Sequence, residues 1–313
     1  MIRTRLRDFV RTDEDCFFSV VDYFHPDGIR GILRYAPDEE GNRFANGMKY
    51  RKYDFADSFD YMRKHHPDWI ADVHIIPQER ISEILSPVDR VPEVVDSDEQ
   101  IKTIVTVLSD AGIPMSKQGV TGSILPGLQN DMSDIDFVIY GPDWFKARDA
   151  INRAKLSSSL IEAIDENMWQ RIYRKRSPEI SYDEFLLHEL RKGNRGMVNG
   201  TYFDLLFTRD WDQIHQPLER GTDTKHIQIK ATVTDATFAF DNPALYKIDH
   251  EEIDHILSYT HTYSGQALTG ERIEARGVVE ELGHKKRLVV GTSREPRGEW
   301  MRSLTLLEKE GLL

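Results

Sequence analysis

The sequence predicts an α+β protein of three domains, and three observations support that prediction. Before about residue 220, apolar runs of strand length alternate with segments of helical periodicity. From about residue 225 the chain changes to short β-like runs separated by Asp-Asn-Pro and by glycines, which is typical of an antiparallel sheet or small barrel. Between residues 86 and 96, two prolines without a helical period indicate a linker. We therefore expect a small N-terminal α+β domain (1–90), a central domain (91–220) and a C-terminal β-rich domain (221–313).

Composition excludes several classes of protein. Hydrophobic residues make up 39% of the 313 residues and aromatic residues 10%, which is enough to build cores and argues against global disorder. The 41 Lys and Arg against 53 Asp and Glu give a net charge of −12. This charge argues against a surface coated in basic residues for bulk nucleic-acid binding, although it leaves a local basic groove open.

The single cysteine and the N-terminal residues indicate the compartment. Cys16 lies beside Phe17 and Phe18 and is expected in a core, because a lone cysteine forms neither an internal disulfide nor a thiolate metal cluster. The first residues lack the apolar segment of a signal peptide, and no run approaches the length of a membrane span. We expect a cytoplasmic protein without a membrane partner.

The N-terminal segment predicts a hairpin followed by a helix. Strand-like runs over residues 16–24 and 29–35 are joined by His25-Pro-Asp-Gly28, a turn sequence. Phe55, Phe59 and Met62 have helical spacing and predict a helix over residues 56–64. Residues 48–53 alternate basic and aromatic side chains. This segment is either a half-exposed strand, which we favour, or a segment that binds nucleic acid.

Three helices are predicted in the central segment. Ser97 is expected to cap the first, which Gly112 and Pro114 end, and its apolar face consists of Ile101, Ile104, Val105 and Leu108. Pro142 suits the first turn of the second, which buries Trp144, Ala147 and Ile151. Ser181-Tyr-Asp-Glu184 forms the capping box of the third, which Gly193 ends and which has an apolar face of Phe185, Leu186 and Leu190.

The stretch Val120–Tyr140 contains the clearest chemical signal. A Gly122-Ser123 pair is followed by ten residues, then by Asp134-Ile-Asp136 and the apolar tetrad Phe137–Tyr140, which predicts a buried strand. Residues two apart on a strand face one side of the sheet, so both carboxylates approach the same spot. Two adjacent carboxylates repel unless a proton or cation lies between them, and magnesium prefers oxygen ligands. A turn at Gly122-Ser123 offers backbone N–H groups and a hydroxyl to phosphate oxygens.

A third carboxylate interrupts a second apolar strand. Asp204 lies inside Thr201–Phe207, where a carboxylate is costly unless something compensates its charge. A metal ion shared with Asp134 and Asp136 would do so, and three such acids can hold two magnesium ions. Asp204 would then complete the metal on the side of the attacking hydroxyl, while Gly122 and Ser123 hold the β- and γ-phosphates of a triphosphate.

With these residues in place, the sequence resembles the nucleotidyltransferase superfamily of DNA polymerase beta, which includes CCA-adding enzymes, poly(A) polymerases and antibiotic nucleotidyltransferases. The resemblance covers residues 97–210 and rests on Gly122-Ser123, Asp134-Ile-Asp136 and Asp204. The whole-chain layout is also similar to archaeal proteins described as predicted nucleotidyltransferases, which have like N- and C-terminal extensions. One departure is Pro126-Gly127, which follows closely where family members often begin a helix.

The resemblance implies a fold and a reaction. It implies a mixed sheet flanked by helices and catalytic, metal-binding roles for Asp134, Asp136 and Asp204. It further implies two Mg²⁺ ions, with Mn²⁺ as an alternative, and a nucleoside triphosphate donor such as ATP that releases pyrophosphate. Gly122 and Ser123 would bind the nucleotide.

Basic residues gather after the second predicted helix. Residues 171–195 contain seven Lys or Arg against four Asp or Glu, a reversal of sign in an acidic protein. These side chains are either phosphate contacts or solvated helix faces. The candidates are Arg171, Arg174, Lys175, Arg176, Lys192 and Arg195, and we assign Lys192 and Arg195 to nucleotide binding. A second basic excess lies in the loops near Lys285–Arg287 and Arg294–Arg297.

Three functions fit these observations. The leading hypothesis is an enzyme that transfers a nucleoside monophosphate to a hydroxyl acceptor, with RNA or tRNA favoured as the acceptor. The alternatives are a protein or small-molecule nucleotidylyltransferase, and a non-catalytic module that binds nucleotide or nucleic acid. His188 is expected to be packed or exposed rather than catalytic.

Overall fold

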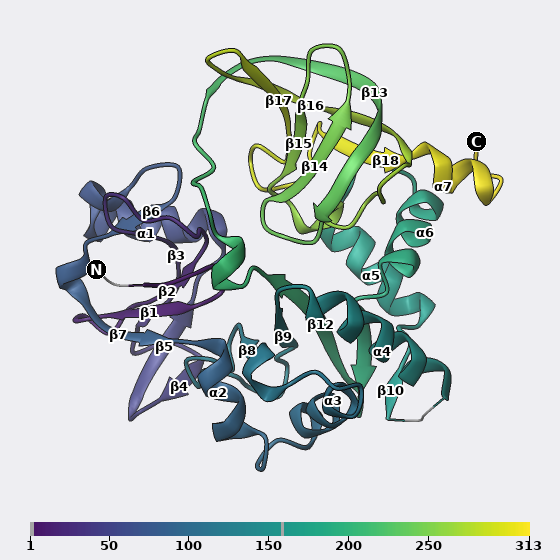
Figure 1. Cartoon of the computed structure of the whole chain (residues 1–313). Coiled ribbons are helices and arrows are strands. Elements are labelled where there is room, and N and C mark those ends of the chain that lie inside the picture. Colours follow the sequence, from purple (N-terminus) through teal and green to yellow (C-terminus); the bar gives the residue numbers. More distant parts are fainter. Residues whose placement is uncertain (1–2, 158–159) are drawn as a thin grey trace. The chain divides into compact units, whose positions relative to one another are not determined.

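The computed structural model describes residues 3–157 and 160–313 (Figure 1). These residues form seven α-helices and three β-sheets, which confirms the α+β class. The chain divides into two compact units. Unit 1 comprises Met1–Ala163 and Asn194–Pro217, and unit 2 comprises Ile164–Gly193 and Leu218–Leu313. Each of the three sheets falls within one of the three predicted domains, whose boundaries stay a prediction.

The N-terminal sheet has seven strands in the order β4-β5-β3-β2-β1-β7, with β6 also paired to β3. The predicted hairpin is confirmed, since β2 and β3 are antiparallel neighbours, and the predicted helix is α1, Phe55–His65. The strands are β1 Phe9–Thr12, β2 Phe17–Val20, β3 Ile29–Pro37, β4 Arg43–Ala45, β5 Met48–Lys52, β6 His74–Ile76 and β7 Ile81–Leu85. Residues 48–52 are thus a strand, with Tyr50 buried and its neighbours mostly exposed.

Both faces of this sheet are covered. One face packs Val10, Phe18 and Leu33 against Met62 of α1, and Cys16 is buried there as expected. The other face packs Phe9, Phe17, Tyr35 and Tyr50 against Leu125 and Leu128, which follow the Gly-Ser pair. Because successive strand residues point to opposite faces, the apolar runs of β1 to β3 serve two cores. The second core fastens the Gly-Ser loop to the N-terminal sheet.

The predicted linker over residues 86–96 is wrong, because helix α2, Pro87–Val94, occupies it. Pro87 stands in the first turn, where its missing N–H costs nothing. Pro87, Val91 and Val94 are buried and have helical spacing, while Pro92 is exposed within the helix. The two prolines concealed this period in the sequence.

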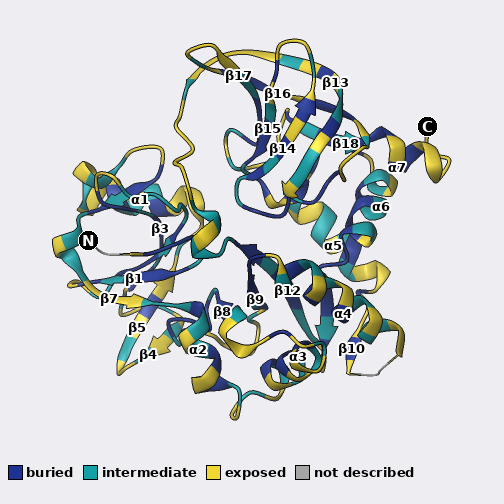
Figure 2. Ribbon diagram, in the orientation of Figure 1, coloured by how far each residue is buried: buried dark blue, intermediate teal, exposed yellow. Residues whose placement is uncertain are grey.

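The central sheet is mixed, with strand order β10-β11-β12-β9-β8. The strands β9 and β12 are parallel and the other neighbours are antiparallel. The elements are α3 Glu99–Asp110, β8 Gln118–Thr121, β9 Ile135–Tyr140, α4 Asp143–Ser157, β10 Ile161–Glu162, β11 Arg195–Val198 and β12 Thr201–Thr208. The apolar faces predicted for α3 and α4 are buried (Figure 2). The predicted cap of α3 is one residue off, since Asp98 and not Ser97 accepts from Gln100 N and Ile101 N.

Unit 2 combines three helices with a β-barrel. The pairings β13–β14, β14–β15, β15–β17, β17–β16 and β16–β13 form a closed ring in which β15 and β17 are parallel, and β18 extends the edge of β16. The sequence predicts an antiparallel sheet or small barrel here, and the structure has a barrel with one parallel pair. The elements are α5 Glu166–Arg176, α6 Tyr182–Lys192, β13 Thr222–Phe238, β14 Ala244–Asp249, β15 His255–Ser258, β16 Arg272–Leu282, β17 Lys285–Val290, β18 Trp300–Ser303 and α7 Leu304–Lys309.

Helix α6 begins and ends as predicted and buries Phe185 as predicted, but the rest of its buried face differs. Ser181 and Glu184 form the capping box, and Gly193 ends the helix in the left-handed conformation. Leu190, predicted on the apolar face, is 59% exposed, whereas Glu189 and Lys192 are buried. The charged pair is buried because its members neutralise each other. Among the described residues, no helix is both long enough and apolar enough to cross a membrane.

Candidate active site

Strand register brings the predicted acids together in the central sheet. In the parallel pair β9–β12, Asp136 lies directly opposite Asp204. Asp134 lies immediately before β9, and its charge and that of Asp204 both act on Asp136. Asp134 is exposed, and Asp136 and Asp204 are half-buried. Residues separated by about seventy positions in the chain therefore meet through one strand pairing.

The electrostatics at Asp136 reflect this crowding. Its pKa is raised to about 7, first because burial removes the carboxylate from water and then because Asp134 and Asp204 are negative. The positive charges of Arg7 and Arg34 oppose that rise. A carboxylate in this position gains stability from any cation placed between it and the neighbouring acids.

The Gly122-Ser123 pair lies in a tight turn at the end of β8. Gly122 has a φ of +66°, and a Cβ there would stand 2.3 Å from Asp136 Oδ2. Only glycine permits this close approach of the turn to the acid. Ser123 is buried, and Ser123 O accepts a hydrogen bond from Leu128 N at 2.8 Å. The turn continues through Gly127 without a helix, so Pro126 marks a real departure from the pattern in which a helix follows the Gly-Ser pair.

Two contacts fix this loop from outside. Arg90 Nε of α2 donates to Ile124 O at 3.0 Å. Thr121 Oγ1 at the end of β8 donates to Arg7 O at 2.7 Å. Residues 87–94 therefore contribute to the site as a helix, because helix α2 positions Arg90 to bind the loop.

The donor chemistry at the acids suits a hard divalent cation, but the three carboxylates do not form a ready-made metal cage. Among the residues that the structure describes, no group of three or more His, Cys, Asp or Glu is arranged to hold a metal ion. One reason is visible in β11, where Arg195 Nε donates to Asp204 Oδ1 at 2.6 Å. Asp134 and Asp136 offer oxygen donors, while Asp204 is bound to an arginine.

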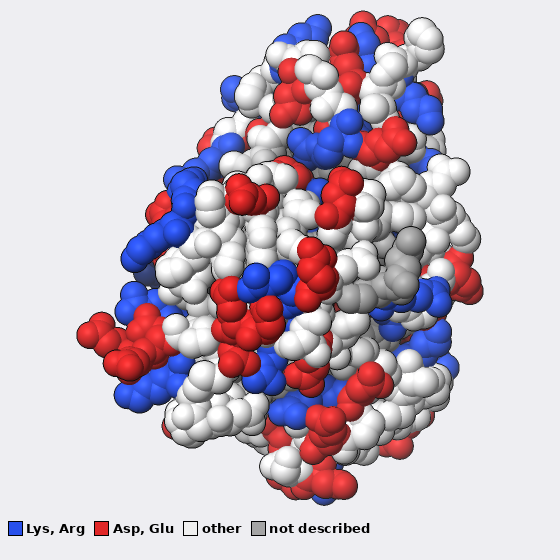
Figure 3. All heavy atoms as spheres, turned by 90° about the vertical axis from the view of Figure 1, so that its left-hand side faces the viewer, with Lys and Arg blue, Asp and Glu red and all other residues white. Residues whose placement is uncertain are grey.

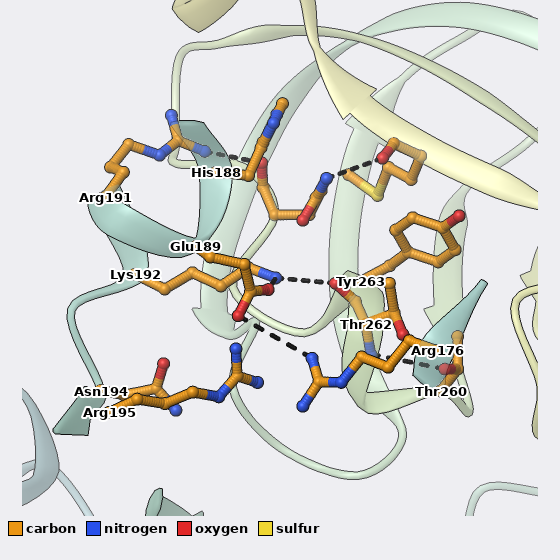
Figure 4. A network of polar contacts seen from close by, with 12 residues as sticks. Arg176, His188, Glu189, Arg191, Lys192, Asn194, Arg195, Thr260, Thr262 and Tyr263 are labelled. Carbon is orange, nitrogen blue, oxygen red and sulfur yellow. Dashed lines mark hydrogen bonds and ion pairs between the residues drawn. The ribbon is translucent and has the colours of Figure 1, made fainter. Parts of the chain in front are cut away.

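The two basic residues assigned to nucleotide binding occupy different environments. Arg195 is buried and contacts Asp204, within unit 1. Lys192 belongs to unit 2, where Nζ donates to Glu189 Oε1 and Thr262 O, both at 2.7 Å (Figure 4). Arg176 lies 3.8 Å from Glu189 in the same network. The other candidates on α5, Arg171, Arg174 and Lys175, are exposed. A role in nucleotide binding stays a prediction for Lys192 and Arg195.

His188 is packed, as one of the two expected outcomes. Its Nδ1 lies 2.6 Å from Glu184 O, and its Nε2 accepts from Ser303 N at 3.0 Å. Burial lowers its pKa to about 3, so the neutral ring serves as a structural link within unit 2.

Sequence reasoning missed the basic residues of the N-terminal sheet that act on the acids. Arg34 of β3 is among the charges that lower the pKa of Asp136. Lys52 of β5 interacts electrostatically with Asp134 and Asp136, as well as with Arg34 and Arg43. The alternation of basic and aromatic residues over 48–53 was the available signal, although the pattern alone does not show which acid Lys52 faces.

One comparison with known proteins identifies a relative of the chain. The chain is 38% identical over 338 residues to a protein of Methanocaldococcus jannaschii named uncharacterized protein MJ1086, which covers 96% of this chain and 99% of that protein. The chain belongs to the family of MJ1086. No protein-family model matches the chain, and no solved structure matches it. The alignment spans both compact units, so the relative shares the whole arrangement of segments rather than one domain.

Proposed function

We propose that the protein is a metal-dependent nucleotidyltransferase of the DNA polymerase beta type, which moves a nucleoside monophosphate from a triphosphate to a hydroxyl acceptor. The observation that supports this most is the pairing of Asp136 with Asp204 across parallel strands, with Asp134 immediately before β9. The Gly122 turn packed against Asp136 adds a phosphate-binding element next to the acids. In this proposal the mixed central sheet is the catalytic core.

The chain's own groups would act mainly by position and charge. Magnesium, when bound, would lower the pKa of the attacking hydroxyl and neutralise the triphosphate. Asp134 and Asp136 would hold it, and Asp204 would join them once Arg195 released its carboxylate. The backbone of Gly122 and the hydroxyl of Ser123 would orient the β- and γ-phosphates. Manganese would serve as an alternative ion.

RNA or tRNA is our favoured acceptor. The closed ring of unit 2, with one parallel pair, has the strand arrangement of the five-stranded barrels that bind oligonucleotides. The likeness of strand arrangement supports an oligonucleotide acceptor, and the surface charge does not add to that support. Figure 3 shows Lys and Arg mixed with Asp and Glu on the face turned to the viewer, rather than a continuous basic surface. A protein or small-molecule acceptor is therefore the second hypothesis, and a non-catalytic binding module is the third.

The test is transfer of label from α-labelled nucleoside triphosphates, each supplied with Mg²⁺ or Mn²⁺ and pooled small RNA. The variants Asp134→Asn, Asp136→Asn and Asp204→Asn remove the charges while keeping the side-chain size. Asp131→Asn is the matched control, because Asp131 is an exposed acid of the same loop. We expect label on RNA with the wild type and Asp131→Asn, and none with the other three.

Other outcomes separate the hypotheses. Label on protein or on a small molecule, with the same dependence on the three acids, would replace RNA as the acceptor. Binding of nucleotide without magnesium and without transfer to any acceptor would favour the binding module and contradict catalysis. Transfer that survives all three substitutions would refute the assignment of the site.

A further inference from the structure

We propose that the N-terminal sheet supplies the cations that bind the polyphosphate of the substrate, with Arg34 and Lys52 as the contact residues. This inference rests on the proposed function, because it names the ligand of the same site. It assigns a ligand to residues of the N-terminal sheet, and it identifies that ligand chemically as a nucleoside triphosphate or inorganic polyphosphate bound together with a divalent cation.

The first observation is a bulge in β3. Phe17 of β2 pairs with Tyr35, whereas the next residue, Phe18, pairs with Leu33. Arg34 is thus an extra residue without a partner in β2. A bulge of this kind redirects a side chain and is frequent next to active sites. Here it allows Arg34 to depart from the strict alternation of the strand, and Arg34 acts on both Asp136 and Tyr35.

The second observation is the register between β3 and β5. Lys52 lies directly opposite Tyr35, so both side chains leave the sheet on the same face. Tyr35 and Tyr50 of that face pack with Leu125 and Leu128 of the Gly-Ser loop. Lys52 therefore stands at the end of the very face that covers the loop, which agrees with its electrostatic interaction with Asp134 and Asp136.

Direct hydrogen bonds join the N-terminal segment to the loop and the strand that carry the acids. Arg43 Nη1 of β4 donates to Leu128 O at 3.1 Å and to Ser133 Oγ at 2.9 Å, immediately before Asp134. Arg7 Nε donates to Phe207 O of β12 at 3.3 Å. We assign Arg43 a positioning role, because its guanidinium is bound to the loop. These bonds belong to unit 1 and make the basic residues a fixed part of the site.

The negative charges of the acids and the positive charges of Arg34 and Lys52 are complementary to a polyphosphate that carries a metal ion. Among the described residues, the side chains of Arg34 and Lys52 make no hydrogen bond or ion pair, although they interact electrostatically with the acids. The acids would hold the cation, and the two basic side chains would meet the phosphate oxygens that extend beyond it. A cation alone would pair only with the acids, and an anion alone would pair only with Arg34 and Lys52. A polyphosphate with a bound metal ion would pair with both groups.

The experiment measures binding without turnover. Wild-type protein and the variants Arg34→Gln and Lys52→Gln are titrated with Mg²⁺ and inorganic tripolyphosphate, and separately with Mg²⁺ and ATP, by calorimetry. Lys49→Gln is the matched control, because Lys49 is an exposed lysine of the same strand on the opposite face. Thermal unfolding of each variant shows whether it is folded. We expect each of the two variants to weaken binding of both ligands about tenfold or more, and Lys49→Gln to leave it unchanged.

The outcomes for this inference and for the proposed function are distinguishable. If folded Arg34→Gln and Lys52→Gln bind tripolyphosphate as the wild type does, or if the wild type binds none, the inference is wrong even where the acid variants abolish transfer. If no acceptor is ever labelled but both variants lose tripolyphosphate binding, the inference stands while catalysis fails. An equal loss in Lys49→Gln would show a general charge effect and overturn the assignment of residues.

Discussion

At the scale of single residues, the contact between Gly122 and Asp136 is the most sensitive point of the site. A Cβ at position 122 would meet the carboxylate at 2.3 Å and would require a φ of +66° that other residues rarely adopt. We predict that Gly122→Ala lowers the free energy of unfolding by at least about 1–2 kcal/mol, the cost of the left-handed conformation. It should also abolish transfer, because Asp136 must move. Denaturant unfolding and the labelling assay measure the two effects.

Gly47→Ala and Gly200→Ala are matched controls for that prediction. Both glycines have positive φ, +80° and +78°, with nothing within 4 Å of an added Cβ. Each follows an asparagine that also has positive φ, in an Asn-Gly turn between antiparallel strands. They should reproduce the conformational cost but keep full activity. If Gly122→Ala is no more harmful to activity than these, the close approach has no functional role.

His74 predicts a pH dependence of stability. Burial lowers its pKa from 6.5 to about 4, and its Nδ1 accepts a hydrogen bond from Leu33 N at 3.1 Å. Between pH 6.5 and 4 the unfolded chain binds a proton that the folded state excludes, so stability falls as pH falls through this window. Protonation of His74 is expected to lower the free energy of unfolding by a total on the order of 3 kcal/mol across this window. Thermal unfolding across this range should show a shallower pH slope for His74→Asn, and an unchanged slope would contradict the assignment.

The acids of the site could be predicted from sequence, whereas its cations could not. Asp136 and Asp204 are predictable because a carboxylate inside an apolar strand is unusual whatever the partner strand is, and Asp134 is found from its spacing to Asp136. Arg34 and Lys52 look like ordinary surface residues, since their role depends on a bulge and on packing between segments that are distant in sequence. For Lys192 the sequence pattern suggested a phosphate contact, because the residue lies in a basic run, whereas in the structure it is buried beside Glu189.

At the scale of elements, helix α6 carries a buried ion pair where sequence suggests leucine. Lys192 and Glu189 are both 2% exposed, and Lys192 Nζ lies 2.7 Å from Glu189 Oε1. We predict that Glu189→Ala lowers the free energy of unfolding by about 3–5 kcal/mol, because it removes the carboxylate that binds the buried ammonium of Lys192. Chemical denaturation, followed in unit 2 through a probe near Trp169, would measure the loss.

The double variant Glu189→Met, Lys192→Met tests the cause. It removes both charges and keeps the side-chain volume, so much of the lost stability should return. A double variant as unstable as Glu189→Ala would show that packing, and not the loss of the ion pair, determines the effect.

Helix α6 itself was predictable from sequence, whereas its buried face was not. A capping box and a terminal glycine are local signals, whereas the partner of a charged side chain is a tertiary one.

Two other elements, α2 and β14, were difficult to predict because prolines lie in or next to them. In α2, Pro87 and Pro92 hid the spacing of Val91 and Val94, although a proline in the first helical turn is favourable. In the C-terminal barrel, β14 follows a turn at Asn242-Pro243, which the sequence indicates only as a separator between β-like runs. Its pairing with both β13 and β15 defines the ring, so the sequence indicated β-structure without indicating closure.

At the scale of the whole molecule, unit 1 is interrupted by a segment that belongs to unit 2. The strands β10 and β11 that flank this segment are antiparallel, with Ile161 opposite Val198 and Glu162 opposite Met197. The chain therefore leaves β10 close to the point at which it enters β11. A short loop is the ordinary connection between such strands. Residues 164–193 thus form an insertion into a hairpin, and unit 1 has a complete sheet without them.

This arrangement predicts that unit 1 folds alone. We expect a chimera of residues 1–163 and 194–217, joined by a loop of about four Gly and Ser residues, to unfold cooperatively and to bind Mg²⁺ with tripolyphosphate as the full chain does. Residues 218–313 alone should not fold, because they lose the contacts of Glu271 with Arg191 and of Ser303 with His188. If the chimera is unfolded, or if it folds but loses tripolyphosphate binding, unit 1 does not contain the whole site. If the chimera binds but transfers nothing to RNA, the acceptor depends on unit 2.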